Sequence, residues 1–91
     1  MLYTMEEPKK SVKEYILQEF LPGENPDELT DSTPLITGGI LDSMAIMRLI
    51  TFLEEHFRIE LQAYETGLDH LNSISDIAKL VQSKLPVKVV G

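Results

Sequence analysis

The 91-residue chain contains no cysteine. This absence excludes a disulfide, a thiolate nucleophile and a zinc site with cysteine ligands. Any reactive thiol would therefore have to come from a cofactor. A chain of this length must rely on one hydrophobic core, because two cores would leave each half too short to bury enough apolar surface.

Long apolar runs and positive charge are also scarce. No run approaches the ~18 residues of a membrane span, and residues 1–10 lack the apolar centre of a signal peptide. Eight basic against fifteen acidic residues give a net charge of −7, which repels nucleic-acid phosphates and favours basic partner surfaces. We expect a cytoplasmic monomer without a nucleic-acid partner.

Apolar residues recur at helical spacing in the first part of the chain. The pattern predicts a helix over residues 9–20, which ends before Pro22. Its start is open, because Pro8 suits a first helical position while Ser11 and Glu14 have the spacing of a capping box. The apolar face is formed by Val12, Tyr15, Ile16 and Phe20.

Residues 21–42 form a long connection without a sustained period. Three prolines, three glycines and many polar side chains indicate a loop. Loops of this length in compact domains are uncommon and tend to be functional or disordered. We expect this loop to be ordered, because it contains apolar residues that can pack against the helices, namely Leu29, Leu35, Ile36, Ile40 and Leu41.

Three further helices are predicted after this loop. The best amphipathic pattern covers residues 43–57, a short helix lies within residues 63–71, and Ser73 caps a last helix that ends near Leu85. The core face of the 43–57 helix should contain Ile46, Leu49, Ile50, Leu53 and Phe57. That of the last helix should contain Ile74, Ile77, Ala78 and Val81.

These elements predict an all-α fold. Three long helices, one short helix and a long first connection make a small up-and-down four-helix bundle. The domain should span residues 9–85, between a flexible N-terminal segment, 1–8, and a flexible C-terminal tail, 86–91.

Ser43 is the candidate functional residue, because it opens the 43–57 helix after a Gly38-Gly39 turn. A serine at this place often serves only as the helix cap. Asp42 could equally be the cap, which would leave the Ser43 hydroxyl available. The N–H groups and positive dipole end of a helix start favour a phosphate.

A catalytic role for Ser43 requires a base within hydrogen-bonding distance. His56 is thirteen residues further along the same helix, roughly 20 Å away. No Gly-x-Ser-x-Gly turn surrounds the serine, and the acidic residues and histidines show no metal-binding spacing. We therefore expect neither enzymatic activity nor a metal site.

The run Gly-Ile-Leu-Asp-Ser-Met at residues 39–44, followed by Leu-Glu-Glu-His-Phe at 53–57, resembles the modification site of acyl and peptidyl carrier proteins. The resemblance covers residues 9–85 and is to the discrete bacterial type. It implies that Ser43 carries 4′-phosphopantetheine, derived from coenzyme A, and that Asp42 helps a phosphopantetheinyl transferase recognise the site. The protein would then carry acyl or aminoacyl groups as thioesters.

The outward face of the 43–57 helix is less acidic than that of general fatty-acid carriers. This difference favours a specialised pathway, such as polyketide, nonribosomal peptide or aminoacyl transfer. The implied partners are a loading ligase and a downstream acyltransferase, synthase or condensation enzyme. The residues expected to contact them are Met44, Ala45, Arg48, Phe52 and Glu55.

A second hypothesis needs no cofactor. The chain could be a helical interaction module that binds a partner through the outward face of residues 43–57 without modification. The intact mass after coexpression with a broad transferase separates the two hypotheses.

Overall fold

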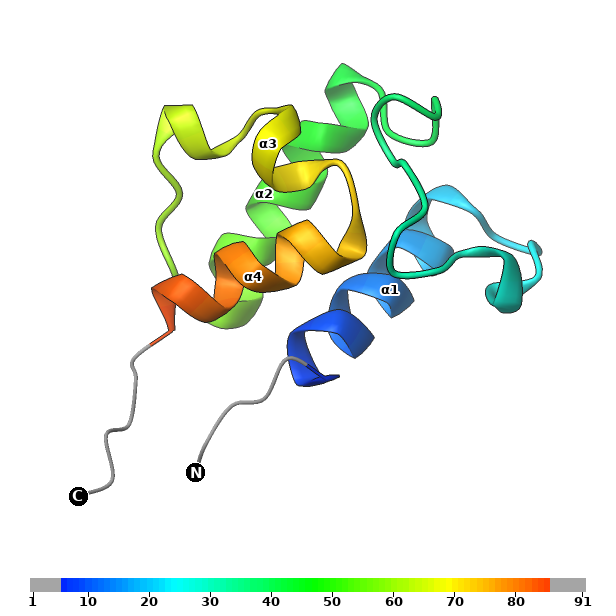
Figure 1. The fold of residues 1–91 in the computed structure, drawn as a ribbon, viewed down its shortest axis with the longest axis horizontal. Coiled ribbons are helices and arrows are strands. Elements are labelled where there is room, and N and C mark those ends of the chain that lie inside the picture. Colours follow the sequence, from blue (N-terminus) through cyan, green and yellow to red (C-terminus); the bar gives the residue numbers. More distant parts are fainter. Residues whose placement is uncertain (1–5, 86–91) are drawn as a thin grey trace.

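The computed structural model describes residues 6–85 and contains four α-helices in that range. They are α1 (Glu6–Phe20), α2 (Ser43–Phe57), α3 (Leu68–Leu71) and α4 (Ile74–Lys84), with 3₁₀ turns η1 (Pro26–Glu28) and η2 (Ala63–Glu65) (Figure 1). The described residues contain no strand, so the all-α prediction is confirmed. The predicted short helix in 63–71 consists of two pieces, η2 and α3, on either side of Gly67.

The helix α1 begins three residues before the predicted start. It includes Pro8, which lies in the first helical turn and is fully buried. Proline is tolerated there because the first amides of a helix have no partner within the helix. The predicted flexible segment 1–8 is therefore too long at its C-terminal end, since residues 6–8 are helical. The rest of that segment, residues 1–5, and the predicted tail 86–91 lie outside the described residues.

The helix α4 packs against α1 and α3, and α1 also contacts α2 (Figure 1). The predicted core residues of α4 are fully buried, and Ser73 caps this helix by accepting a hydrogen bond from the Asp76 amide at 3.0 Å. Each α-helix contributes to one core, whose helical members include Val12, Ile16, Leu49, Leu53, Leu71, Ile74, Ile77 and Val81.

The buried face of α2 is turned toward α1 relative to the prediction. Leu49 and Leu53 are fully buried as expected, but Ala45 joins them, whereas the other predicted core residues are only half-buried. The cause is the position of α1, which packs against one edge of α2 and contacts it through Tyr15. The half-buried residues are Ile46, Ile50 and Phe57.

The connection between α1 and α2 is held by its apolar residues and by Asn72. Leu29, Leu35 and Leu41 are buried as predicted. The Leu35 amide donates to the Asn72 carbonyl oxygen at 2.7 Å, and the Asn72 side chain accepts from the two following amides at 2.8 and 3.0 Å. This part of the connection is thereby fixed against the turn between α3 and α4.

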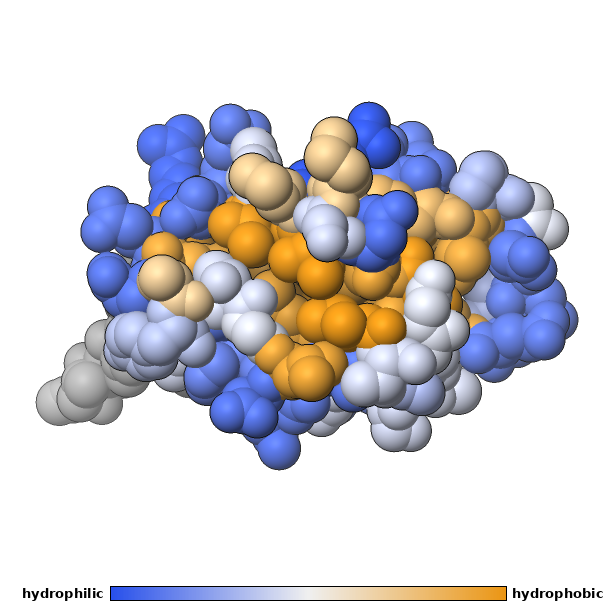
Figure 2. All heavy atoms as spheres, turned by 90° about the horizontal axis from the view of Figure 1, so that it is seen from above, coloured by the Kyte–Doolittle hydropathy of each residue, from blue (hydrophilic) through white to orange (hydrophobic). Residues whose placement is uncertain are grey.

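None of the helices between residues 6 and 85 combines the length and the hydropathy that crossing a bilayer requires. Seen from above, the molecule gathers apolar side chains in the middle of one face, with polar side chains around the edge (Figure 2). Among residues 6–85, the large apolar side chains that are more than half exposed lie on α2, η2 and α3. They are Met44, Met47, Tyr64 and Leu68.

Candidate functional site

Asp42, rather than Ser43, caps α2. Its backbone is extended, and its Oδ1 atom accepts a hydrogen bond from the Ala45 amide at 2.8 Å. Its carbonyl oxygen accepts the Ile46 amide, also at 2.8 Å. The two alternatives that the sequence leaves open are therefore resolved in favour of Asp42, because one side chain satisfies the cap and the serine is not needed for it.

Ser43 is the first residue of α2 and is exposed. Within residues 6–85, no hydrogen bond involves its hydroxyl. The next residue, Met44, is 72% exposed, so the surroundings of the hydroxyl are open to solvent. The hydroxyl is therefore accessible to a modifying enzyme without any change in the helix or its cap.

The turn before Asp42 depends on two glycines. Gly39 has a φ of +82°, a conformation that side chains rarely adopt, and its amide donates to the Ile36 carbonyl oxygen at 3.1 Å. At Gly38 there is no room for a Cβ atom, which would collide with the Pro34 carbonyl oxygen. The turn closes with the Leu41 amide donating to the Leu35 carbonyl oxygen at 2.9 Å, which fixes where α2 starts.

The electrostatics at this end of α2 favour an anion. Its first turn contains no acidic residue, and the capping carboxylate of Asp42 takes up only the Ala45 amide of the unpaired N–H groups. The remaining amides and the helix dipole leave partial positive charge near Ser43. A phosphate attached to the Ser43 hydroxyl would lie at this positive end.

Of the five residues expected to contact partners, three are exposed as expected: Met44, Arg48 and Glu55. Ala45 does not lie on the exposed face as predicted, because its side chain is 7% exposed and belongs to the core. Phe52 is half-buried, and its ring stacks on that of Tyr15 with centroids 4.0 Å apart and an interplanar angle of 12°. Both corrections have the same cause, namely the packing of α1 along this edge of α2.

Sequence reasoning did not assign Tyr15 to the site. Its hydroxyl donates to the Arg48 carbonyl oxygen at 3.1 Å, which connects α1 to the middle of α2. Burial raises the pKa of Tyr15, the nearby Glu19 carboxylate raises it further, and Arg48 opposes the change. The signal in the sequence was a tyrosine on an apolar stripe, since a partly buried phenol requires a hydrogen-bond partner.

His56 is placed where it cannot activate Ser43, and His70 lies on another helix. His56 lies near the opposite end of this helix, roughly 20 Å from Ser43 by helical rise, and its ring stacks on Phe52 with centroids 4.9 Å apart. His70 lies on α3 beside a groove formed with Asp69, Asp76 and Lys79. In residues 6–85 no three acidic or histidine side chains are arranged to hold a metal ion.

Comparison with known proteins adds no family assignment. No family model matches the chain. No curated protein matches it either.

Proposed function

We propose that the chain is a carrier protein and that Ser43 bears a 4′-phosphopantetheine arm. The observation that carries this proposal is the accessible Ser43 hydroxyl at the first position of α2, which forms no hydrogen bond with residues 6–85 because Asp42 provides the cap. The positive helix end and the absence of acidic residues in the first turn suit the phosphodiester that would form there.

In this proposal the chain provides position and recognition. A phosphopantetheinyl transferase joins the Ser43 oxygen to the phosphorus of the pantetheine phosphate and releases the nucleotide part of coenzyme A. The chain has no cysteine and therefore no thiol of its own. The bound arm supplies the thiol on which thioesters form. Asp42 holds the start of α2 through its cap, and its exposed carboxylate is available to the transferase.

The four described helices and the long α1–α2 connection are compatible with the up-and-down bundle of carrier proteins. On the surface of α2, Arg48 stands near two strongly exposed methionines, Met44 and Met47. This combination supports a specialised acyl or aminoacyl pathway over general fatty-acid synthesis. The partners would be a loading ligase and a downstream acyltransferase, synthase or condensation enzyme.

The test is to incubate the purified chain with coenzyme A and a transferase of broad specificity and to measure the intact mass. We expect one phosphopantetheine adduct on the parent chain and none on Ser43→Ala. Ser32→Ala is a matched control, because Ser32 is an exposed serine in the α1–α2 connection. An unmodified parent, or an adduct that persists on Ser43→Ala, would refute the proposal.

The second candidate is an interaction module that acts unmodified through α2. Met44 and Met47, which are 72% and 66% exposed, favour it because apolar surface of this kind binds proteins with or without a cofactor. Under this hypothesis the chain remains unmodified in the same experiment, and Ser43→Ala leaves partner binding unchanged.

A further inference from the structure

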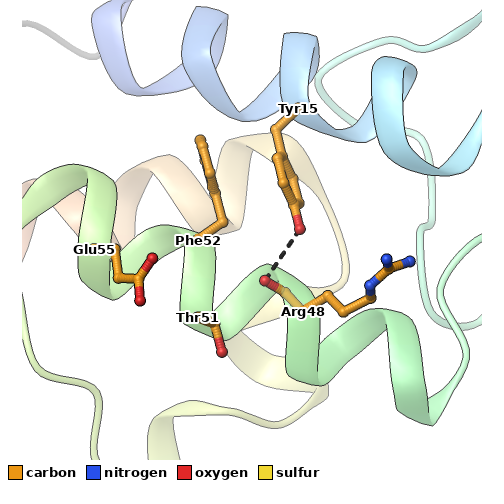
Figure 3. A pocket seen from close by; sticks show the side chains of 5 residues that line it. All are labelled: Tyr15, Arg48, Thr51, Phe52 and Glu55. Carbon is orange, nitrogen blue, oxygen red and sulfur yellow. Dashed lines mark hydrogen bonds between the residues drawn. The ribbon is translucent and has the colours of Figure 1, made fainter.

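A shallow groove of about 330 Å³ runs between α1 and α2. Its lining residues lie on both helices (Figure 3): Tyr15, Arg48, Thr51, Phe52 and Glu55. The Tyr15 ring projects from α1 toward α2 and the Phe52 ring projects from α2 toward α1, whereas the Arg48 and Glu55 side chains extend toward opposite ends of the groove. The groove therefore has an aromatic wall, a cation at one end and a carboxylate at the other.

The groove is preformed. Tyr15 is held by the hydrogen bond from its hydroxyl to the Arg48 carbonyl oxygen and by its stacking on Phe52. The Phe52 ring also stacks on His56. The Thr51 hydroxyl donates to the Met47 carbonyl oxygen at 3.1 Å, which fixes its direction. Because these contacts exist without a ligand, binding would not require the wall to be ordered first.

The charges at the two ends are available to a partner. Arg48 and Glu55 are exposed, and neither forms an ion pair within the described part of the chain. Glu19 is near Tyr15 and lines an adjacent groove together with Arg48, so it moderates the positive charge at that end. By contrast, Lys9 and Lys84 are paired with Asp31 and Glu65.

The separation of these charges matches a helical ligand. Arg48 and Glu55 are seven residues apart on α2, about two turns or 10 Å along its axis. A second helix lying along the groove repeats at the same spacing, and its side chains three or four residues from the first charge lie between the two ends. Those side chains would contact the Tyr15 and Phe52 rings.

We propose that this groove binds one helix of a partner protein. The partner helix carries a carboxylate opposite Arg48 and a lysine or arginine two turns away opposite Glu55, with an apolar side chain between them on the aromatic wall. Charge complementarity at both ends selects this helix from helices of uniform charge. The inference does not depend on the modification of Ser43.

The test uses three synthetic helical peptides that differ only at two positions seven residues apart. These positions hold Glu and Lys, two Lys, or two Glu, with leucines between them. Each peptide is titrated at low salt into the isotope-labelled full chain, and binding is followed by the backbone amide shifts. The parent should prefer the Glu/Lys peptide, Arg48→Glu the Lys/Lys peptide and Glu55→Arg the Glu/Glu peptide. Each peptide charge that faces an opposite charge on the protein should lower Kd about two- to fivefold.

Two further variants separate local charge from net charge. Arg58→Glu changes the net charge by the same amount as Arg48→Glu, but Arg58 lies at the C-terminal cap of α2 and outside the groove. It should keep the parent's preference. The double variant Arg48→Glu with Glu55→Arg should still prefer the Glu/Lys peptide, which binds in the reverse direction.

The largest shifts should fall on Tyr15, Thr51 and Phe52. The proposal is overturned if all forms rank the peptides in the same order, if the shifts lie outside the groove, or if no peptide shifts these amides at millimolar concentration. Circular dichroism and thermal unfolding establish that the variants remain folded before they are compared. Because the peptides test the groove and the mass experiment tests Ser43, failure of one does not imply failure of the other.

Discussion

The Leu35 amide and the Asn72 carbonyl oxygen are joined by a hydrogen bond of 2.7 Å, although the residues are 37 positions apart. The Asn72 side chain then accepts hydrogen bonds from the Ile36 and Thr37 amides. One residue between α3 and α4 thus pairs three consecutive amides of the connection that leads to α2. The position of the Ser43 end of α2 depends on this contact as well as on the local turn.

Asn72→Ala should loosen the connection before α2. The Ile36 and Thr37 amides, which donate hydrogen bonds to the Asn72 side chain, would lose their acceptor. Where these amides remain shielded from water, the loss should lower the free energy of unfolding by ~1–3 kcal/mol. Urea unfolding measures the loss, and hydrogen exchange should accelerate at residues 36 and 37. Gln18→Ala is the control, because Gln18 is exposed on α1. Equal protection of the two amides in Asn72→Ala and the parent would contradict this assignment.

Alanine at Leu49 or Leu53 should destabilise the fold strongly. Both side chains are fully buried in the core, so each substitution leaves a cavity and should lower the free energy of unfolding by ~2–5 kcal/mol. Met47→Ala, on the same helix but at a residue that is 66% exposed, should change it by less than about 0.5 kcal/mol. If the two leucine variants lost as little stability as is expected for Met47→Ala, the assignment of these leucines to the core would be contradicted.

Alanine should destabilise the fold more at Gly38 or Gly39, in the turn before Asp42, than at Gly67. Gly39→Ala forces an alanine into a positive φ, and Gly38→Ala drives a methyl group into the Pro34 carbonyl oxygen, so each should cost ~1–3 kcal/mol. At Gly67 the φ is −101° and nothing lies within 4 Å of the added Cβ. Gly67→Ala should therefore be close to neutral. Thermal unfolding of the three variants under one set of conditions measures these differences. Equal midpoints for all three variants would contradict the prediction.

Acid should weaken the contact between η2 and α4. The Lys84 ammonium, 2.6 Å from Glu65 Oε1, and the hydrogen bond from the Gln62 amide lower the pKa of Glu65 below its usual value of 4.5. A lowered carboxyl pKa contributes stability that is fully present above the unfolded-state value and is lost as the pH falls through the folded-state value. The contribution should therefore be complete at neutral pH and disappear in the acid range below 4.5.

Glu65→Gln provides the comparison for this pH dependence. The parent should be more stable than the variant near pH 7, and the two unfolding midpoints should converge in acid. Lys84→Met should reduce the same pH dependence because it removes the main cause of the lowered pKa. A difference between parent and Glu65→Gln that persists unchanged into strong acid would mean that the ion pair is not its source.

Local patterns in the sequence were sufficient to predict α2, the Ser73 cap and the burial of Leu49 and Leu53. Periodicity and capping depend on neighbours within one or two turns, which the sequence contains directly. The burial of Ala45 was missed because a periodic pattern identifies an apolar face but not the side from which the next helix approaches. The role of Asn72 was missed for a similar reason, since a hydrogen bond across 35 residues leaves no local signal.

The contact between Tyr15 and α2 should contribute to stability through two coupled parts, a hydrogen bond and a ring stack. Tyr15→Phe removes the hydroxyl that donates to the Arg48 carbonyl oxygen but keeps a ring to stack on Phe52, so it should cost ~0.5–1.5 kcal/mol. Phe52→Leu keeps the hydroxyl but loses the stacked pair, whose geometry is worth about 0.5–1.5 kcal/mol beyond the area it buries. If both parts act at the same α1–α2 contact, the double variant should lose a different amount from the sum of the single variants, because residues in contact are not additive. Urea unfolding of the four proteins gives this coupling energy. A coupling of zero would mean that the hydroxyl and the ring stack hold α1 and α2 together independently.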